Sequence, residues 1–519
     1  MRSAPSKGGI HKARPRRQRG RPARRRPSRN IDYHSLRNPF APVEIYSSDR
    51  IAAIHNAALD LLENLGMKVL LNEARTLFRA GGAVVDDDTG LVRIGREIVD
   101  AAIGEAPRSI HMVAGAPDKD VTLELGVLTM LAGAGSAYAT DLQRGRRASS
   151  LADFRELVRI TDHFDALQML DALVEPQDVP TQFRHYSAME SQLELSNKIP
   201  FIYSRGSRQA VESFEMLQLH RGVSDAAFAA NPHVYTIINT NSPRLLDIPM
   251  AQGLIDFARH RQLSIVTPFC LMGAMAPVTV AGALTLSHAE ALAGIALTQL
   301  AQPGAPVCYG SFISNVDLKS GAPAFGTPEQ VRANLASGQL ARLIGLPWRC
   351  AAGSSANVND AQAANETQMG MWSCLLAGST IVLHAAGWIE GGLTVSYEKF
   401  ITDMEVVHMF ADLCQARGGD EDDLALDALQ EVNPGGHFFG CEHTMQRYQT
   451  AFYPPLVADW STFGTWNARG RKDASERATE MWKRIVRDHE PPPANANRME
   501  KLRQYIAKHK AAGGAPPVS

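Results

Sequence analysis

The segment His384-Ala-Ala-Gly-Trp388-Ile-Glu390-Gly-Gly392 combines three chemically versatile side chains with three glycines. Histidine can donate or accept hydrogen bonds, glutamate carries a negative charge, and the face of an indole ring attracts cations. The glycines let the backbone turn sharply near a ligand. We therefore predict that His384 and Glu390 are catalytic residues and that Trp388 contacts a substrate. The alternative for His384 is a histidine that is simply hydrogen-bonded in the core.

The elements that must position these residues follow from the apolar pattern. From residue 128 to residue 403, short apolar runs alternate with amphipathic stretches. Such alternation indicates a parallel sheet, and eight units fit a closed barrel. An open doubly wound sheet is the rival, but it usually carries a glycine-rich phosphate loop, and no convincing one occurs here. We therefore predict an α/β fold with a (β/α)8 barrel. Its strand-like runs lie near residues 130–134, 167–173, 201–204, 234–239, 264–268, 307–310, 347–351 and 380–384.

The reactive groups of a (β/α)8 barrel collect at the carboxyl ends of its strands. Polar and aromatic residues at those positions are therefore predicted to bind a substrate, although ordinary packing is the alternative for each aromatic ring. The substrate-binding candidates are Tyr309, Phe269, Phe312, Trp388, Asn239 and Glu175. Other residues at such positions are Asp141, Ser204, Arg205, Asn241 and the loop 353–355.

The chain divides into five predicted regions. An apolar stripe that ends at Gly66 predicts a helix from Ser48 to Leu65, and a charged helix is predicted from Asp473 to His489. The regions are a disordered Arg-rich tail (1–35), a helical cap (36–127), the barrel (128–403), a helical and irregular extension (404–490) and a flexible tail (491–519).

The composition is that of a soluble globular protein, with 45% hydrophobic and 21% charged residues. No run of eighteen apolar residues occurs, so we expect no membrane-spanning segment. The six cysteines are far apart and include no C-x-x-C pair, which fits free thiols in a reducing compartment. The expected location is the cytoplasm.

The formal net charge of −1 conceals a basic N-terminal segment. Residues 1–30 contain twelve Lys and Arg residues and no acid, whereas the rest has an acidic excess. The segment lacks an apolar pattern, so we expect it to be disordered and dispensable for folding. Arg19-Gly20-Arg21-Pro22 resembles a motif that inserts arginine into the DNA minor groove. A solvated tail is the favoured interpretation, and nucleic-acid binding the less favoured one.

Several segments resemble the trimethylamine methyltransferase (MttB) superfamily, over about residues 45–490. The archaeal trimethylamine enzymes carry pyrrolysine in the loop after the seventh strand, where this chain has Gly353-Ser-Ser-Ala356. It therefore resembles the non-pyrrolysine members, which are associated with glycine betaine and similar quaternary amines. The segments are Met275–Leu284, Ser287-His-Ala-Glu290, Asp360–Ala363 with Glu366, Val382–Gly392 with Tyr397–Phe400, and Gly436–Gly440 with His443-Thr444.

The resemblance implies a methyltransferase that passes a methyl group to Co(I) of a corrinoid (cobalamin) cofactor carried by a cognate corrinoid protein. A quaternary nitrogen already carries a full charge and leaves as a neutral amine, so the enzyme needs a cation site rather than a proton donor. Aromatic faces suit such a cation. Glu390 would balance the substrate charge, and His384 would bind a substrate carboxylate or orient Glu390.

Two other functions are compatible with the sequence. One is a barrel without catalytic activity that binds a betaine while its basic tail contacts nucleic acid. The other is a metal-dependent lyase, because His437-x-x-x-Cys441-x-His443 contains zinc-ligand types. A fourth ligand is lacking, and we expect no bound metal. The substrate remains open among glycine betaine, proline betaine, carnitine, choline and a sulfonium analogue, and a homo-oligomer is compatible with the sequence.

Overall fold

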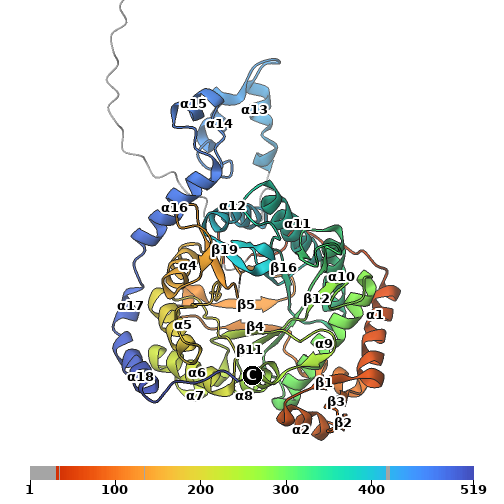
Figure 1. Cartoon of the computed structure of the whole chain (residues 1–519). Coiled ribbons are helices and arrows are strands. Elements are labelled where there is room, and N and C mark those ends of the chain that lie inside the picture. Colours follow the sequence, from red (N-terminus) through yellow and green to blue (C-terminus); the bar gives the residue numbers. More distant parts are fainter. Residues whose placement is uncertain (1–30, 34–35, 134, 416–420, 519) are drawn as a thin grey trace, which may run out of the picture. The chain divides into compact units, whose positions relative to one another are not determined.

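The structure, a computed structural model, describes residues 31–33, 36–133, 135–415 and 421–518 (Figure 1). These residues form two compact units. The smaller unit contains residues 421–454, and the larger one contains all the other described residues. The Arg-rich segment 1–30, for which we predict a disordered tail, lies outside the described residues.

Six parallel strands form the main sheet of the larger unit, a half-barrel in the order β6-β17-β16-β13-β11-β9. Nearly every residue of these strands is buried, as expected for a parallel sheet that helices cover. The strands are β6 (Thr129–Met130), β9 (Tyr235–Ile238), β11 (Leu263–Val266), β13 (Val307–Gly310), β16 (Trp348–Ala351) and β17 (Ile381–Leu383).

One long helix connects each strand of the half-barrel to the next, from β9 to β17, and these helices lie around the sheet in Figure 1. The side chains of Thr279, Thr327 and Asp360 accept hydrogen bonds from the first turns of three of them, which fixes where those helices begin. The helices are α8 (Ile248–Arg259), α9 (Val280–Ala301), α10 (Pro328–Ile344) and α11 (Ala361–Ala377). They are preceded by α4 (Leu151–His163), α5 (Thr181–Leu195), α6 (Ser207–Arg221) and α7 (Asp225–Ala230), and followed by α12 (Tyr397–Leu413).

Two of the eight predicted strands are not strands of this sheet. Residues 167–173 and 201–204 contribute only single parallel bridges. A buried side chain takes the place of a backbone partner here, because Gln168 Oε1 accepts the N–H of Met130 at 2.8 Å. The apolar pattern of a run does not reveal that a side chain will replace a backbone hydrogen-bond partner. The regular main sheet is therefore a parallel half-barrel of six strands, to which the other two runs add single bridges.

Two smaller sheets lie beyond the carboxyl ends of the main strands. In each, a short strand follows a strand of the half-barrel along the chain, so these sheets line the end where a barrel carries its reactive groups. One consists of β12 (Phe269–Met272), β14 (Phe312–Val316) and β15 (Pro323–Ala324). The other consists of β7 (Tyr138–Thr140), β8 (Arg147–Ala148), β18 (Trp388–Ile389) and β19 (Thr394–Ser396), with the turn η3 (Glu390–Gly392).

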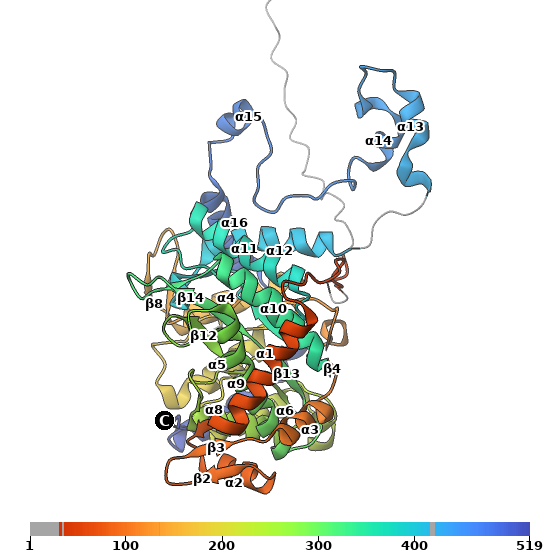
Figure 2. The ribbon, with the colours of Figure 1, turned by 90° about the vertical axis from the view of Figure 1, so that its right-hand side faces the viewer.

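The predicted helix of residues 48–65 is present as α1 (Ser48–Asp60) followed by a π-helical turn, η1 (Leu61–Leu65). Gly66 ends it with a φ of 67°. Figure 2 shows α1 beside α9 and α10, so the N-terminal region covers these helices. Its other elements are β1 (Met67–Val69), α2 (Asn72–Ala80), β2 (Val84–Asp86), β3 (Leu91–Arg93), α3 (Arg96–Glu105), β4 (Ser109–Met112), η2 (Pro117–Lys119) and β5 (Val121–Glu124), and β1 pairs with β10 (Leu245–Leu246) from the larger part of the chain.

Helix α9 is the one helix among the described residues that is long and apolar enough to cross a membrane. The 18-residue window that meets this criterion is 78% buried within the fold. Its apolar surface therefore packs within the protein core, against α1, α3 and α8.

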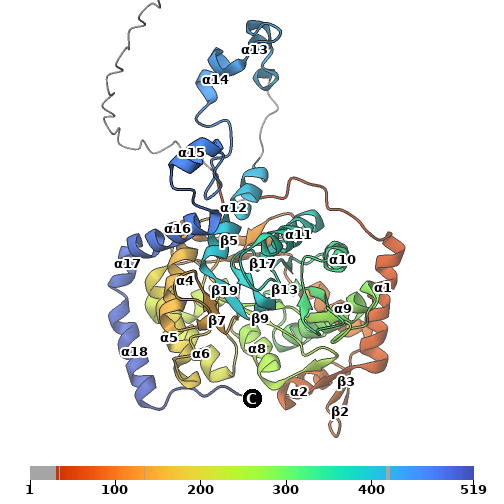
Figure 3. The same cartoon turned by 45° about the horizontal axis from the view of Figure 1, so that its top comes forward.

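The C-terminal residues differ from the prediction. The charged helix forms as α16 (Ala474–Asp488), which begins with a capping box at Asp473 and packs against α12 and α4. Residues 491–518, predicted to be a flexible tail, instead form α17 (Pro493–Ala496) and α18 (Met499–Ala511) along α5 and α6 (Figure 3). Buried apolar side chains hold α18 in place. The residues that they contact lie on other helices, so the local sequence did not predict this packing. These side chains are Met499, Leu502 and Ile506.

The remaining elements are short. The larger unit also contains α15 (Phe463–Ala468). The smaller unit contains η4 (Glu421–Leu424), α13 (Leu426–Glu431), η5 (Phe438–Gly440) and α14 (Glu442–Arg447).

Buried neutral histidines predict that acid destabilises the protein. Burial lowers the pKa of each to about 3 or 4 in the folded state, whereas the unfolded chain takes up protons below pH 6.5. Their stabilising contribution is therefore complete above pH 6.5 and is lost as the pH falls towards 4. Burial also raises the pKa of Asp171 to about 7, which acts in the opposite sense. The histidines are His185, His220, His233, His288 and His408.

We expect the free energy of unfolding to decrease by roughly 1 kcal/mol per histidine between pH 7 and pH 5.5. Urea unfolding at the two pH values measures this decrease. Neither ring nitrogen of His220 has a hydrogen-bond partner among the residues that the structure describes, so His220→Leu should reduce the decrease by the contribution of about one histidine. An equal or higher urea midpoint at pH 5.5 in the wild type would contradict the prediction.

Candidate active site

A cavity of about 290 Å³ lies at the carboxyl ends of the half-barrel strands. The fold brings five of the predicted residues together there. Three of them follow the ends of different main strands, and the other two lie in the loop after a fourth strand. They are Asn239, Phe269, Phe312, His384 and Trp388. The rest of the lining consists of Gly135, Phe201, Tyr203, Ile237, Arg349, Leu383, Gly391, Gly392 and Leu393.

Aromatic rings form much of the cavity wall. The Phe312 ring centroid lies 4.9 Å from that of Phe269, 5.3 Å from that of Phe325 and 5.9 Å from that of Trp388. The imidazole of His384 stacks on the indole of Trp388 with a centroid distance of 4.1 Å and an interplanar angle of 17°. Such a group of ring faces can hold a cation without hydrogen bonds.

Two glycines create the space for Trp388. Gly353 has a φ of 109°, and a β-carbon there would lie 2.3 Å from Cε3 of the indole. Gly392 has a φ of 102°, and its β-carbon would lie 2.2 Å from Cζ2. Any side chain would therefore displace the ring, and the loop after β16 lies directly against it.

The loop that carries His384 is held by a buried ion pair on α12. Lys399 is paired with Asp403, and its Nζ also donates to Thr367 Oγ1 at 2.8 Å. The second oxygen of Asp403 accepts the N–H of Gly387 at 2.9 Å. The Tyr397–Phe400 segment, noted for its resemblance to the superfamily, thus helps to position the His384–Trp388 turn.

Glu366 organises the neighbouring loop after β16. Its Oε2 accepts hydrogen bonds from Ser354 Oγ at 2.7 Å and from the N–H groups of Ser355 and Ala356. The carbonyls of Ser354 and Ala356 in turn accept the N–H groups of Gly391 and Glu390. The two loops that enclose Trp388 are therefore joined to each other.

Arg349 places a positive charge in the cavity wall. This residue of β16 is only 2% exposed, and its Nη2 lies 3.4 Å from Nε2 of His384. Neither Nε nor Nη1 has a hydrogen-bond partner among the described residues. Burial lowers the pKa of Arg349 to about 10, so the guanidinium is still protonated at neutral pH.

His384 is neutral in this setting. Burial and the Arg349 charge hold the pKa of His384 well below its usual range. Because Nε2 faces an arginine N–H, Nε2 accepts and the ring proton resides on Nδ1. In the part of the chain that the structure describes, Nδ1 has no hydrogen-bond partner, and neither does Nε1 of Trp388. The cavity thus contains several buried N–H donors that lack an acceptor.

The family model described as trimethylamine methyltransferase (MTTB) matches residues 12–514 of the chain. The chain belongs to the trimethylamine methyltransferase (MTTB) family. It is therefore a methyltransferase, as the sequence resemblance predicted.

Two relatives with assigned activities resemble this methyltransferase over nearly their whole length. Glycine betaine methyltransferase of Desulfitobacterium hafniense (strain Y51) is 31% identical over 466 residues, which cover 89% of this chain and 96% of the relative. Trimethylamine methyltransferase MttB of Desulfitobacterium hafniense (strain DSM 10664 / DCB-2) is 28% identical over 465 residues, covering 89% and 93%. The crystal structure of the Methanosarcina barkeri monomethylamine methyltransferase (MtmB) covers 90% of this chain and 95% of its own at 9% identity, with a TM-score of 0.43.

Glu390 does not line the cavity of this methyltransferase. Both of its carboxylate oxygens accept from Nε of Arg146, at 2.9 and 3.0 Å. The Arg146 guanidinium also lies 3.8 Å from the ring centroid of Tyr138. The carboxylate expected to balance a substrate cation is therefore already paired, and it connects the turn η3 to the hairpin of β7 and β8.

Tyr309 also lies outside the cavity. Its hydroxyl is 3.1 Å from Nδ1 of His288 on α9, and the ring is buried. His288 contacts His55 of α1 through its other nitrogen, at 2.9 Å. Tyr309 thus faces the helix layer, because neighbouring residues of a strand point to opposite faces.

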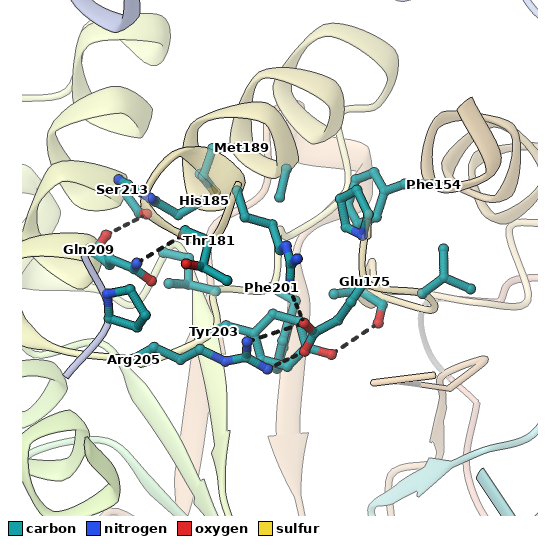
Figure 4. A pocket seen from close by; sticks show the side chains of 17 residues that line it. Phe154, Glu175, Thr181, His185, Met189, Phe201, Tyr203, Arg205, Gln209 and Ser213 are labelled. Atoms are coloured by element: carbon teal, nitrogen blue, oxygen red, sulfur yellow. Dashed lines mark hydrogen bonds and ion pairs between the residues drawn. The ribbon is translucent and has the colours of Figure 1, made fainter. Parts of the chain in front are cut away.

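Glu175 belongs to a second, narrower pocket of about 40 Å³. Figure 4 shows its carboxylate beside the Arg205 guanidinium, and Arg184 donates to it at 2.8 Å. Phe201 and Tyr203 line both pockets and lie between the two sites. Two arginines therefore neutralise Glu175, which leaves no free charge for a substrate cation.

Asp141 has a structural environment as well. Its buried carboxylate pairs with Arg144 at 2.6 Å and with Arg147 at 2.9 Å. It also accepts two backbone N–H groups of the loop between β7 and β8. These contacts lower the pKa of Asp141 although burial opposes them. Asp141 thus stabilises this loop.

The possible zinc ligands lie in the smaller unit. His437, Cys441 and His443 are all described, and Cys441 contacts Thr444 Oγ1 at 3.3 Å. Within the described part of the chain, no three His, Cys, Asp or Glu residues are arranged to hold a metal ion.

Sequence reasoning missed three residues of the site: Arg349, Phe325 and Tyr203. Arg349 is a charged residue within the apolar run 347–351, and a charge is expensive to bury without a partner. That anomaly was the available signal. Tyr203 lies near the end of the predicted run 201–204, a position that could have suggested it, whereas Phe325, which packs on Phe312 beside the cavity, had no such signal.

Proposed function

We propose that this methyltransferase removes a methyl group from a quaternary amine, glycine betaine or a related compound, and transfers it to Co(I) of a corrinoid carried by a partner protein. The aromatic cavity is the observation that carries the proposal. Among its described lining residues there is no aspartate or glutamate. Attraction of a cation therefore depends on the faces of Phe269, Phe312 and Trp388.

The protonation state of the site agrees with a quaternary substrate. A neutral His384 holds its proton on Nδ1 and cannot act as a strong acid. Demethylation of a quaternary amine needs no proton at nitrogen, because the product leaves as a neutral tertiary amine. Catalysis by this chain then consists of holding the substrate in line with the methyl acceptor and excluding water.

The methyl acceptor is proposed to come from outside the chain. None of the six cysteines, all of them free and buried, lines the cavity. A Co(I) corrinoid supplies a strong nucleophile when its carrier protein docks. The open end of the cavity is where that nucleophile would approach, and free thiols are consistent with our placing the enzyme in the cytoplasm.

We further propose that the half-barrel belongs to a closed (β/α)8 barrel. Backbone hydrogen bonds support a ring through the two irregular runs. Gln168 donates to Met130 of β6 at 3.3 Å, Leu170 donates to Ile199 at 2.9 Å, and Ile202 donates to Tyr235 of β9 at 3.0 Å. In this arrangement the cavity occupies the mouth of the barrel. We assign Asn239 to substrate binding and Glu390 to holding the η3 turn.

A comparison of two substrates tests the proposed function. With Co(I) cobalamin or a corrinoid protein as acceptor, glycine betaine should be demethylated. Dimethylglycine should not, because its protonated nitrogen donates a hydrogen bond that the aromatic wall cannot accept well. Methylcobalamin formation measured by absorbance is the readout. Equal turnover of both compounds, or no transfer from any quaternary amine, would contradict the proposal.

A further inference from the structure

The buried guanidinium of Arg349 is poorly satisfied. It has five N–H groups, yet its one side-chain hydrogen-bond partner among the described residues is Nε2 of His384, at 3.4 Å. No ion pair to Arg349 is present in the described part of the chain, and Asp171 acts on it only as a more distant charge. A buried charge of this kind is costly unless a partner arrives. The missing partner is an anion.

Two neighbouring side chains also carry N–H groups that lack an acceptor among the described residues. Nδ1 of His384 and Nε1 of Trp388 are buried N–H donors that have no acceptor within the described ranges. Both residues line the cavity together with Arg349. Arg349 is thus the charged donor of the cavity lining, and it suits a carboxylate because a guanidinium binds carboxylate oxygens in pairs.

The Arg349 charge also disfavours some ligands. A simple quaternary ammonium ion would share the cavity with an uncompensated cation, because the described lining has no carboxylate. In a dry cavity such repulsion is stronger than in water. A zwitterion would bring its own anion to Arg349 and leave its ammonium group for the ring faces. Arg349 lies 5.2 Å from the Phe312 centroid, so the two subsites adjoin.

We propose that Arg349 is the specificity-determining residue that binds the carboxylate of a zwitterionic substrate, with His384 beside it in the cavity wall. The cavity therefore accepts betaines and rejects quaternary ammonium ions that lack an anion. This inference rests on the proposed function, since it requires that the cavity binds a quaternary amine. It adds the residue that recognises the carboxylate of the substrate.

Equilibrium binding tests the assignment without any methyl acceptor. Calorimetric titration of the full chain with glycine betaine, choline and tetramethylammonium gives three dissociation constants. We expect glycine betaine to bind at least thirtyfold more tightly than either cation. Choline or tetramethylammonium binding as tightly as glycine betaine would overturn the role of Arg349 while leaving the aromatic cation site intact. Failure of all three to bind would instead contradict the proposed function.

Variants of Arg349 provide the decisive comparison. Arg349→Met should weaken glycine betaine at least thirtyfold and leave tetramethylammonium unchanged or bound more tightly, because the repelling charge is gone. Arg349→Lys keeps the charge without the planar fork and should give an intermediate affinity for glycine betaine. Equal weakening of both ligands in folded Arg349→Met would show a structural role and overturn the proposal.

A matched control separates these effects from general loss of an arginine. Arg259 is a partly exposed residue of α8 that pairs with Glu73 at 2.7 Å, far from the lining. Arg259→Met should leave the ratio of the two affinities unchanged. Melting temperatures verify folding, and if Arg349→Met does not fold, Arg349→Lys decides: unaltered selectivity in that variant would count against recognition by the guanidinium fork.

Discussion

Replacing Trp388 with leucine is expected to lower kcat/KM for methyl transfer from a quaternary amine by roughly thirtyfold. A cation–π contact in a desolvated site is worth about 2 kcal/mol, which corresponds to that factor. The indole also supports the imidazole of His384 through their stacked rings. Leucine fills much of the volume but offers no ring face. The initial rate of Co(I) cobalamin methylation by glycine betaine measures the effect.

Two further variants isolate the ring face as the cause. Trp388→Phe retains an aromatic surface and should lose much less activity than Trp388→Leu. Trp460 is an exposed tryptophan that does not line the cavity, so Trp460→Leu should behave like the wild type. A folded Trp388→Leu protein with a normal rate would place the cation elsewhere.

Lys399→Met is expected to destabilise the fold by about 3–5 kcal/mol, because it leaves the buried Asp403 carboxylate without its ion-pair partner. Asp403 also holds the N–H of Gly387, so the His384 loop should loosen at the same time. Urea unfolding gives the change in stability. The activity of the folded fraction reports on the loop.

The pairing is tested by adding a second substitution. Asp403→Asn removes the charge but keeps an oxygen for Gly387, so Lys399→Met/Asp403→Asn should recover part of the lost stability. Arg332→Met breaks an exposed contact with Glu329 and should cost less than about 1 kcal/mol. If Lys399→Met also cost less than about 1 kcal/mol, the buried ion pair would contribute little to stability.

The local pattern of the sequence predicted most of the secondary structure. Apolar runs and helix caps have local physical causes, so six of the predicted strands and the helices between them are confirmed. The two remaining predicted strands, 167–173 and 201–204, form only single bridges, and there side chains bind backbone groups of other segments. Gln168 is one of them, and no property of its own run reveals that it will bind Met130. Residues 491–518 differ for the same reason, because their partners lie on α5 and α6.

The sequence by itself also predicted three of the aromatic residues that gather at the cavity, together with Tyr309, which the fold places outside it. Parallel strands end at the same edge, so residues that follow different strands, such as Phe269, Phe312 and Trp388, must come together. Which charges stay free was decided only by the tertiary structure. Glu390 is paired by Arg146 and Glu175 by two arginines, whereas no described residue forms an ion pair with Arg349. A charge is neutralised by whichever opposite charge the fold brings within reach, and these partners come from separate segments of the chain.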